Sequence, residues 1–223
     1  MFPRALISRS LEARLDIIGI CDHNASENVR HIMNAARGTD IRVFPGMEVT
    51  SREEVHLVAL FDTIDPLTAL QDTVYQALPG QNDETAFGCQ AIVNEEGEIE
   101  GFNDRLLIGS TTLSIEDITE IIQRLGGMVI ASHVDRESFG IIGQLGFIPD
   151  SINLDALELS CRTDVDTFRA MHPELERFAF ISSSDAHRLA DIGRAPTTLL
   201  LDEASIAECK LAFEGRKGRA ILE

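Results

Sequence analysis

The chain has 223 residues and a mass of 24.5 kDa, which suffices for one sizeable core and does not require a second domain. Its hydrophobic share of 44% and charged share of 25% are ordinary for a soluble protein. No apolar run approaches the ~20 residues of a membrane helix, and no signal peptide is apparent, so we expect a cytoplasmic protein without membrane contact. A net charge of -18 argues against broad contact with nucleic acid, which binds clustered Lys and Arg.

The first third of the chain predicts alternating helices and short apolar strands. Ser26 is a candidate N-cap and Gly38 a candidate stop for one of the helices. The expected elements are a helix over 5–13, a strand over 15–20, a helix over 26–37, strands over 41–44 and 55–61, and a helix over 65–78.

Residues 87–109 interrupt this rhythm. Two short apolar stretches, 90–94 and 98–102, flank Glu95-Glu96-Gly97, which is typical of a hairpin turn. We therefore expect a small β-hairpin inserted into a single domain that covers residues 1–223.

The second half of the chain returns to the pattern of helices and strands, which favours an α/β fold. The form of the Gly-rich stretch 139–148 is left open. The expected elements are a helix capped by Thr112 or Ser114 and ending at 125, a strand over 128–131, a strand over 155–160, a helix over 164–171, strands over 178–182 and 197–201, and a helix over 205–213.

Six side chains suited to divalent metals lie at or beside four apolar strands. They are His23, Glu48, His56, His133, Asp185 and His187. Imidazoles combined with carboxylates suit Zn, Mn or Fe, and one carboxylate can bridge two ions. A single histidine is more often a hydrogen-bonded residue, and His31 and His172 are interpreted in that way. His56, at the start of its strand, has the alternative role of pairing across a sheet. The four cysteines are widely spaced and are interpreted as ordinary thiols.

These residues stand in motifs that resemble those of the PHP family, the polymerase and histidinol phosphatase superfamily of metal-dependent phosphoesterases. The similarity extends from about residue 15 to residue 195 and includes Asp191-Ile192-Gly193 after the last motif. The motifs are, in order, Cys21-Asp22-His23-Asn24, Gly46-Met47-Glu48 with His56 downstream, Ser132-His133 and Ser184-Asp185-Ala186-His187.

The resemblance implies a distorted (β/α)7 TIM-like barrel that holds two or three divalent ions and activates a water molecule. Glu48 would bridge two ions; His56 and His133 would complete the site of one of them, and Asp185 would bind the other. Glu48 and Asp185 would form the catalytic centre, and His23 and His187 would belong to a third ion. Arg136 would contact the phosphate of a small phosphorylated metabolite or nucleotide, unless it forms a surface ion pair with Asp135 or Glu137. Arg162 and Arg188 are weaker candidates.

One departure from the family pattern concerns the N-terminus. Family members begin with a strand that carries His-x-His, and no such motif precedes Leu15. The fold is therefore expected to lack its first strand, either because the natural protein starts further upstream or because the site has degenerated. We favour the first alternative, since the remaining ligands are all present.

Three functions follow from these expectations. The leading hypothesis is a metal-dependent phosphoesterase. The alternatives are a non-catalytic PHP-like module that binds metal or a partner, and a related metal-dependent hydrolase that cleaves a C–N bond. The oligomeric state is not predicted by the sequence.

Overall fold

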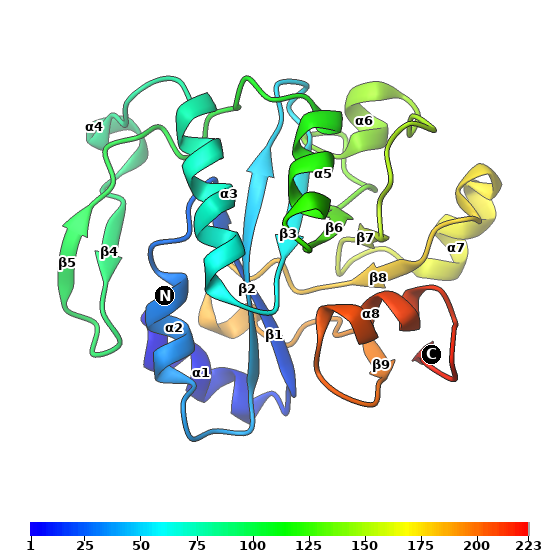
Figure 1. Ribbon diagram of the computed structural model, residues 1–223, viewed down its shortest axis with the longest axis horizontal. Helices are drawn as coiled ribbons and strands as arrows, with labels where there is room; N and C mark the ends of the chain where they lie inside the picture. Colours follow the sequence, from blue (N-terminus) through cyan, green and yellow to red (C-terminus); the bar gives the residue numbers. More distant parts are fainter. Residues whose placement is uncertain (223) are drawn as a thin grey trace.

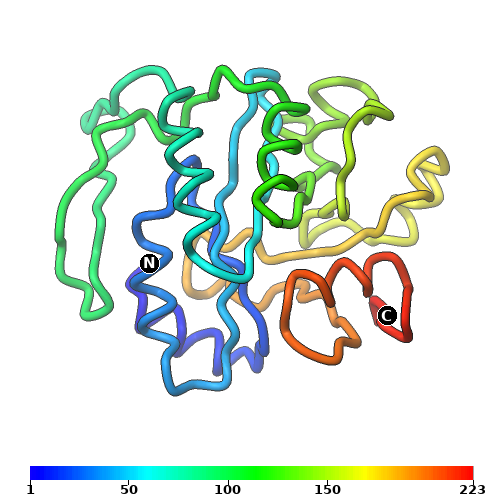
Figure 2. Tube along the Cα trace, in the orientation of Figure 1, coloured from blue at the N-terminus to red at the C-terminus, as the bar shows by residue number. Residues whose placement is uncertain are grey.

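The computed structural model describes residues 1–222 and is organised around one six-stranded sheet (Figures 1 and 2). The strand order in the sheet is β1-β2-β3-β6-β7-β8. These strands are β1 (Ile17–His23), β2 (Arg42–Thr50), β3 (His56–Leu60), β6 (Met128–Ala131), β7 (Ala156–Leu159) and β8 (Phe180–Ser182). The α/β fold is as expected, whereas the expected count of seven barrel strands stays a prediction.

Strand β3 runs antiparallel to both of its neighbours, whereas the other pairs in the sheet are parallel. Its first residue, His56, is therefore paired with Thr50 at the end of β2, and Leu57 is paired with Ala131 at the end of β6. The start of β3 thus lies at the same edge of the sheet as the carboxyl ends of the parallel strands.

Helices flank the sheet, and α3 and α5 lie over one of its faces in Figure 1. The predicted helix over 26–37 is shorter than expected, and the open stretch 139–148 contains one short helix. The helices are α1 (Pro3–Glu12), α2 (Val29–Ala35), α3 (Ile64–Ala77), α4 (Glu84–Phe87), α5 (Ile115–Arg124), α6 (Ile141–Leu145), α7 (Val165–Met171) and α8 (Ile206–Phe213), with single 3-10 turns at Pro173–Leu175 and Leu189–Asp191. None of the helices within residues 1–222 is long and apolar enough to span a membrane.

Alternate residues of the strands supply two separate apolar clusters, because successive side chains of a strand point to opposite faces. Leu57 and Leu157 belong to the larger cluster, which also includes buried residues of α3 and α5. Leu60 and Ile130 belong to a smaller cluster that is completed by Ile206 of α8. The sheet is therefore covered on both faces, and its strand ends are held in place by the packing.

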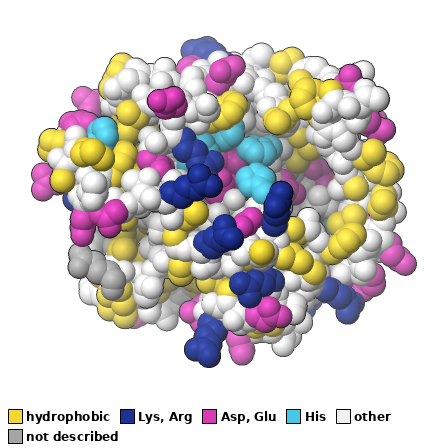
Figure 3. All heavy atoms as spheres, turned by 180° about the vertical axis from the view of Figure 1, so that it is seen from behind, with side chains coloured by type: hydrophobic (Ala, Val, Ile, Leu, Met, Phe, Trp, Pro, Cys, Tyr) yellow, Lys and Arg dark blue, Asp and Glu magenta, His cyan; other side chains and the backbone are white. Residues whose placement is uncertain are grey.

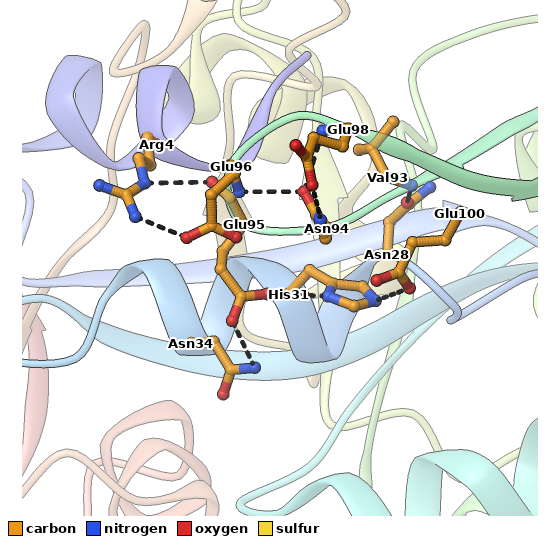
Figure 4. A network of polar contacts seen from close by, with 10 residues as sticks. All are labelled: Arg4, Asn28, His31, Asn34, Val93, Asn94, Glu95, Glu96, Glu98 and Glu100. Atoms are coloured by element: carbon orange, nitrogen blue, oxygen red, sulfur yellow. Dashed lines mark hydrogen bonds and ion pairs between the residues drawn. The ribbon is translucent and has the colours of Figure 1, made fainter.

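The predicted hairpin insertion is present as an antiparallel pair that stands apart from the main sheet (Figure 1). Its strands are β4 (Ala91–Val93) and β5 (Ile99–Phe102). Figure 4 shows how its turn is fastened: Arg4 of α1 forms an ion pair with Glu96 at 2.8 Å. His31 of α2 lies between Glu95, at 3.0 Å, and Glu100, at 3.4 Å. The insertion is thus attached to α1 and α2, the helices that precede and follow β1 in the chain.

The main sheet is open, since no pairing within residues 1–222 joins β1 to β8. A cavity of about 970 Å³ lies between these two edge strands and is lined by residues of both. The last part of the chain, with β9 (Thr198–Leu200) paired to β10 (Ala220–Leu222), forms a separate two-stranded sheet. Residues of β9 line the same cavity.

Candidate metal centre

Glu48 lies at the centre of a cluster of histidines at the edge of the sheet. It stands near the end of β2 and is 7% exposed. One of its oxygens, Oε1, lies 3.2 Å from Nδ1 of His56 and 3.6 Å from Nε2 of His133, and the other, Oε2, lies 3.3 Å from Nδ1 of His23. Three imidazoles from three different strands or strand ends therefore face one carboxylate.

The strand polarity explains why these residues meet. His23 is the last residue of β1 and is paired directly with Glu48, His56 begins the antiparallel strand β3, and His133 follows β6 by two residues. His133 has a φ of 32°, in the left-handed region that non-glycine residues rarely adopt. This backbone geometry costs of order 1–3 kcal/mol and is typical of functional sites.

Asp185 and His187 follow β8 and line the same cavity as His23 and Glu48. Asp185 also has a positive φ, of 42°. Its Oδ2 is 2.8 Å from Nη2 of Arg136, and its Oδ1 is 3.8 Å from Nδ1 of His187. The loop after β8 thus carries a carboxylate and an imidazole next to the histidine cluster.

The donor atoms fit a divalent cation. Ligand atoms of His23, Glu48 and His56 all lie within 4.8 Å of one another. Two imidazole nitrogens in the cluster, Nδ1 of His23 and Nδ1 of His133, are buried without a hydrogen-bond partner within the described residues. A buried nitrogen without a partner is unfavourable, and a cation beside the Glu48 carboxylate would satisfy the lone pair of His23. Histidine with carboxylate is a donor set that suits Zn, Mn or Fe.

The pKa values of two buried carboxyl groups of the site are shifted in opposite directions. Burial would raise the pKa of Glu48, but its hydrogen bonds with His133 and His56 outweigh burial and hold the pKa well below the usual range. Burial raises the pKa of Glu158, on β7, to about 7, and the negative charge of Glu48 adds to this effect while a hydrogen bond with Ser183 opposes it. At neutral pH Glu48 is therefore ionised, whereas Glu158 is close to its titration point.

The structure brings together all six residues that the sequence singled out, with His23, Glu48, His56 and His133 in mutual contact and Asp185 and His187 beside them. Arg136 pairs with Asp185, so the alternative of a surface ion pair with Asp135 or Glu137 is wrong. As expected, His31 and His172 pair with nearby carboxylates outside the site.

Sequence reasoning missed Glu158 and Phe139. Glu158 is an acid inside the apolar run 156–159, and an acid in a buried strand is the signal that could have identified it. The ring of Phe139 stacks on His56 at 4.4 Å, and a long-range contact of this kind leaves no local pattern.

Several known proteins share this architecture. Two structures of Endonuclease Q superpose on nearly the whole chain. The lesion-specific endonuclease from Pyrococcus furiosus has a TM-score of 0.69 and 18% identity over 97% of this chain, and Endonuclease Q in complex with a 27-mer duplex that has an abasic lesion at the active site has a TM-score of 0.70 and 17% identity over 99%. A proposed metal-dependent phosphoesterase from Bifidobacterium adolescentis has a TM-score of 0.55 and 15% identity, with 97% of this chain and 91% of that chain covered.

No family model matches the chain. A curated sequence, the uncharacterized protein YqxK of Bacillus subtilis, is 32% identical over 107 residues, which are 45% of this chain and 27% of that protein. The chain also spans only about half of the Endonuclease Q chains, 52% and 53%. The structural similarities show that the chain has a PHP-type fold, as its motifs predicted.

The comparisons correct one expectation from the composition. The net charge led us to expect no broad contact with nucleic acid, and the partner was expected to be a small phosphorylated substrate; this expectation is wrong. A protein of the same fold is seen with duplex DNA at its active site. The physical reason is that net charge is a sum over the whole molecule, whereas binding depends on the side chains that border the site.

Proposed function

We propose that this chain is a metal-dependent phosphoesterase that hydrolyses phosphodiester bonds in DNA. The observation that carries the proposal is the carboxylate of Glu48 enclosed by three imidazoles at the edge of a PHP-type sheet. The extent of the structural similarity to Endonuclease Q, 97–99% of this chain, supports nucleic acid as the class of substrate.

In this proposal two or three ions of Mn, Zn or Fe would be held by His23, Glu48, His56, His133, Asp185 and His187. Divalent ions bound there would supply an activated water molecule and neutralise charge on the phosphoryl oxygens. Glu48 can act as a metal ligand because its depressed pKa keeps its carboxylate ionised at neutral pH. The imidazoles and Glu48 fix one another through their contacts, so the donor set is already assembled.

Arg136 is assigned to the phosphate that is cleaved. Its side chain is 43% exposed and contacts Asp185 through Nη2. A guanidinium has five N–H donors, so it can bind phosphate oxygens while keeping that contact. The ion pair would hold the guanidinium in the orientation that a phosphate needs.

The test uses purified protein loaded separately with Mn, Zn and Fe. Metal content is measured by elemental analysis, and cleavage is measured on labelled duplexes with and without an abasic site and on a chromogenic phosphodiester. We expect stoichiometric metal and cleavage, both lost in Glu48→Gln and both retained in Glu98→Gln, a control in the hairpin turn.

Absence of both bound metal and turnover would refute the proposal. Retention of metal without hydrolysis of any phosphodiester, together with full function of Asp185→Asn in cells, would support the non-catalytic module. Release of ammonia from amide substrates in place of phosphodiester cleavage would support the C–N hydrolase.

A further inference from the structure

Three consecutive loops beside the candidate metal centre each contain one exposed arginine. Arg136 follows β6, Arg162 follows β7 and Arg188 follows β8. The three strands are neighbours in the sheet and run parallel. Because adjacent strands lie about 4.8 Å apart, their loops leave the sheet side by side, on the edge that carries His133 and Asp185.

The loops are fastened to one another by side chains. The carboxylate of Asp135, in the loop after β6, accepts hydrogen bonds from the backbone N–H of Ser160 at 2.8 Å and from the hydroxyl of Thr163 at 2.6 Å, both after β7. The ion pair between Arg136 and Asp185 joins the loop after β6 to the loop after β8. Arg136 follows Asp135 in the sequence, and Arg162 precedes Thr163. Both arginines therefore stand on loops that these contacts hold together.

Arg162 and Arg188 also differ from most other basic residues in their surroundings. Neither makes an ion pair or a side-chain hydrogen bond within residues 1–222, although most of the arginines there contact a carboxylate. Figure 3 shows Lys and Arg side chains near the histidines on the face that it draws, despite the net charge of -18. A guanidinium group without a carboxylate partner, such as that of Arg162 or Arg188, can bind an anion without first breaking an ion pair.

We propose that Arg136, Arg162 and Arg188 form a phosphate track that holds one DNA strand across the metal centre. This inference rests on the proposed function and extends it to the mode of binding. Arg136, beside Asp185, contacts the phosphate that is cleaved, and Arg162 and Arg188 contact neighbouring phosphates.

The spacing favours a polymer over a single phosphate. Three loops on adjacent strands extend over about 10 Å, which is more than one phosphate group can bridge. A DNA strand presents one phosphate per about 3.4 Å of helix axis. Phosphate contacts fix the position of the strand and carry no sequence information, so the track would hold damaged and undamaged DNA alike.

The test measures DNA binding without hydrolysis. Fluorescence anisotropy of a labelled duplex is recorded over a series of NaCl concentrations, in the presence of Ca²⁺ and in the absence of other divalent ions. The proteins are the wild type, Arg162→Gln, Arg188→Gln and the double variant. Each phosphate contact contributes about 0.9 to the slope of log K against log salt for duplex DNA, so each single variant should lower the slope by about 0.9 and the double variant by about 1.8.

Arg124→Gln is the matched control. Arg124 is exposed and lies in the last turn of α5, ahead of the start of β6, and therefore at the opposite end of that strand from the loops of the track. We expect its slope to equal that of the wild type. The loss of affinity in the track variants should be the same for an intact duplex and for a duplex with an abasic site.

The proposed track is overturned if both single variants keep the wild-type slope, if Arg124→Gln loses as much as they do, or if the wild type does not bind DNA. Cleavage of DNA by variants with unchanged slopes would overturn the track and leave the proposed function intact. Reduced slopes in a protein that never cleaves a phosphodiester would support the track and refute the proposed function.

Discussion

Replacement of Glu158 by Gln is expected to stabilise the metal-free protein at alkaline pH. Glu158 is 7% exposed on β7, and burial raises its pKa from 4.5 to about 7. Each tenfold change in proton affinity is worth about 1.4 kcal/mol, so ionising this group in the folded state costs roughly 3 kcal/mol. Because the pKa of Glu158 is higher in the folded than in the unfolded state, the free energy of unfolding is undiminished below pH 4.5 and falls as the pH rises through 7. Gln cannot ionise and avoids the loss.

The assay is urea denaturation of the wild type and of Glu158→Gln in EDTA at pH 5 and pH 8. The comparison of two proteins at two pH values cancels the contributions to the free energy of unfolding from groups that titrate identically in both proteins. We expect the free energy of unfolding of the variant, relative to the wild type, to be about 2–3 kcal/mol higher at pH 8 than at pH 5. An equal difference at the two pH values would show that Glu158 is already ionised without penalty and would refute the reasoning.

Glu48→Gln should show the opposite pH dependence in EDTA. The pKa of Glu48 is depressed in the folded state, so the stability that its charge contributes is present at pH 7 and is lost in acid. The variant should therefore have a lower free energy of unfolding than the wild type in urea denaturation at pH 7, and this difference should shrink as the pH falls. Ser114→Ala removes the capping box of α5 that Ser114 forms with Asp117 and should lower the free energy of unfolding by about 0.5–2 kcal/mol, with no change in metal content. Gly46→Ala would place a Cβ 2.6 Å from the carbonyl oxygen of Ala59 and should cost about 1–3 kcal/mol in thermal denaturation, whereas Gly101→Ala, with no atom within 4 Å, should be neutral.

The parallel part of the fold was predictable because its strands are short apolar runs that end in polar residues. His23 and His133 follow such runs, and the carboxyl ends of parallel strands meet at one edge, so their proximity to Glu48 followed from local pattern alone. His56 was harder to place, since it begins a strand. Its contact with Glu48 depends on β3 running antiparallel, and strand direction is set by the connections and packing of the whole sheet.

Contacts between loops were beyond local reasoning for a related reason. Asp135 stands next to Arg136 in the sequence, which favours a local ion pair, but its carboxylate instead accepts hydrogen bonds from Ser160 and Thr163. Arg136 turns to Asp185, 49 positions away along the chain. Such choices are decided by which loops the sheet places side by side, and that information appears only once the strand order is known.

The misleading inference from net charge has a specific physical origin. At physiological salt the Debye length is about 8 Å, so a phosphate at the candidate metal centre is affected mainly by the groups that border it. The carboxyl groups that line the cavity include Asp22, Glu48, Glu158 and Asp185. Ionised carboxylates there would repel a phosphate, and bound divalent cations would reverse that effect. Net charge would therefore limit how often an anionic polymer encounters this protein, whereas bound cations and the arginines at the site would decide whether the polymer is held.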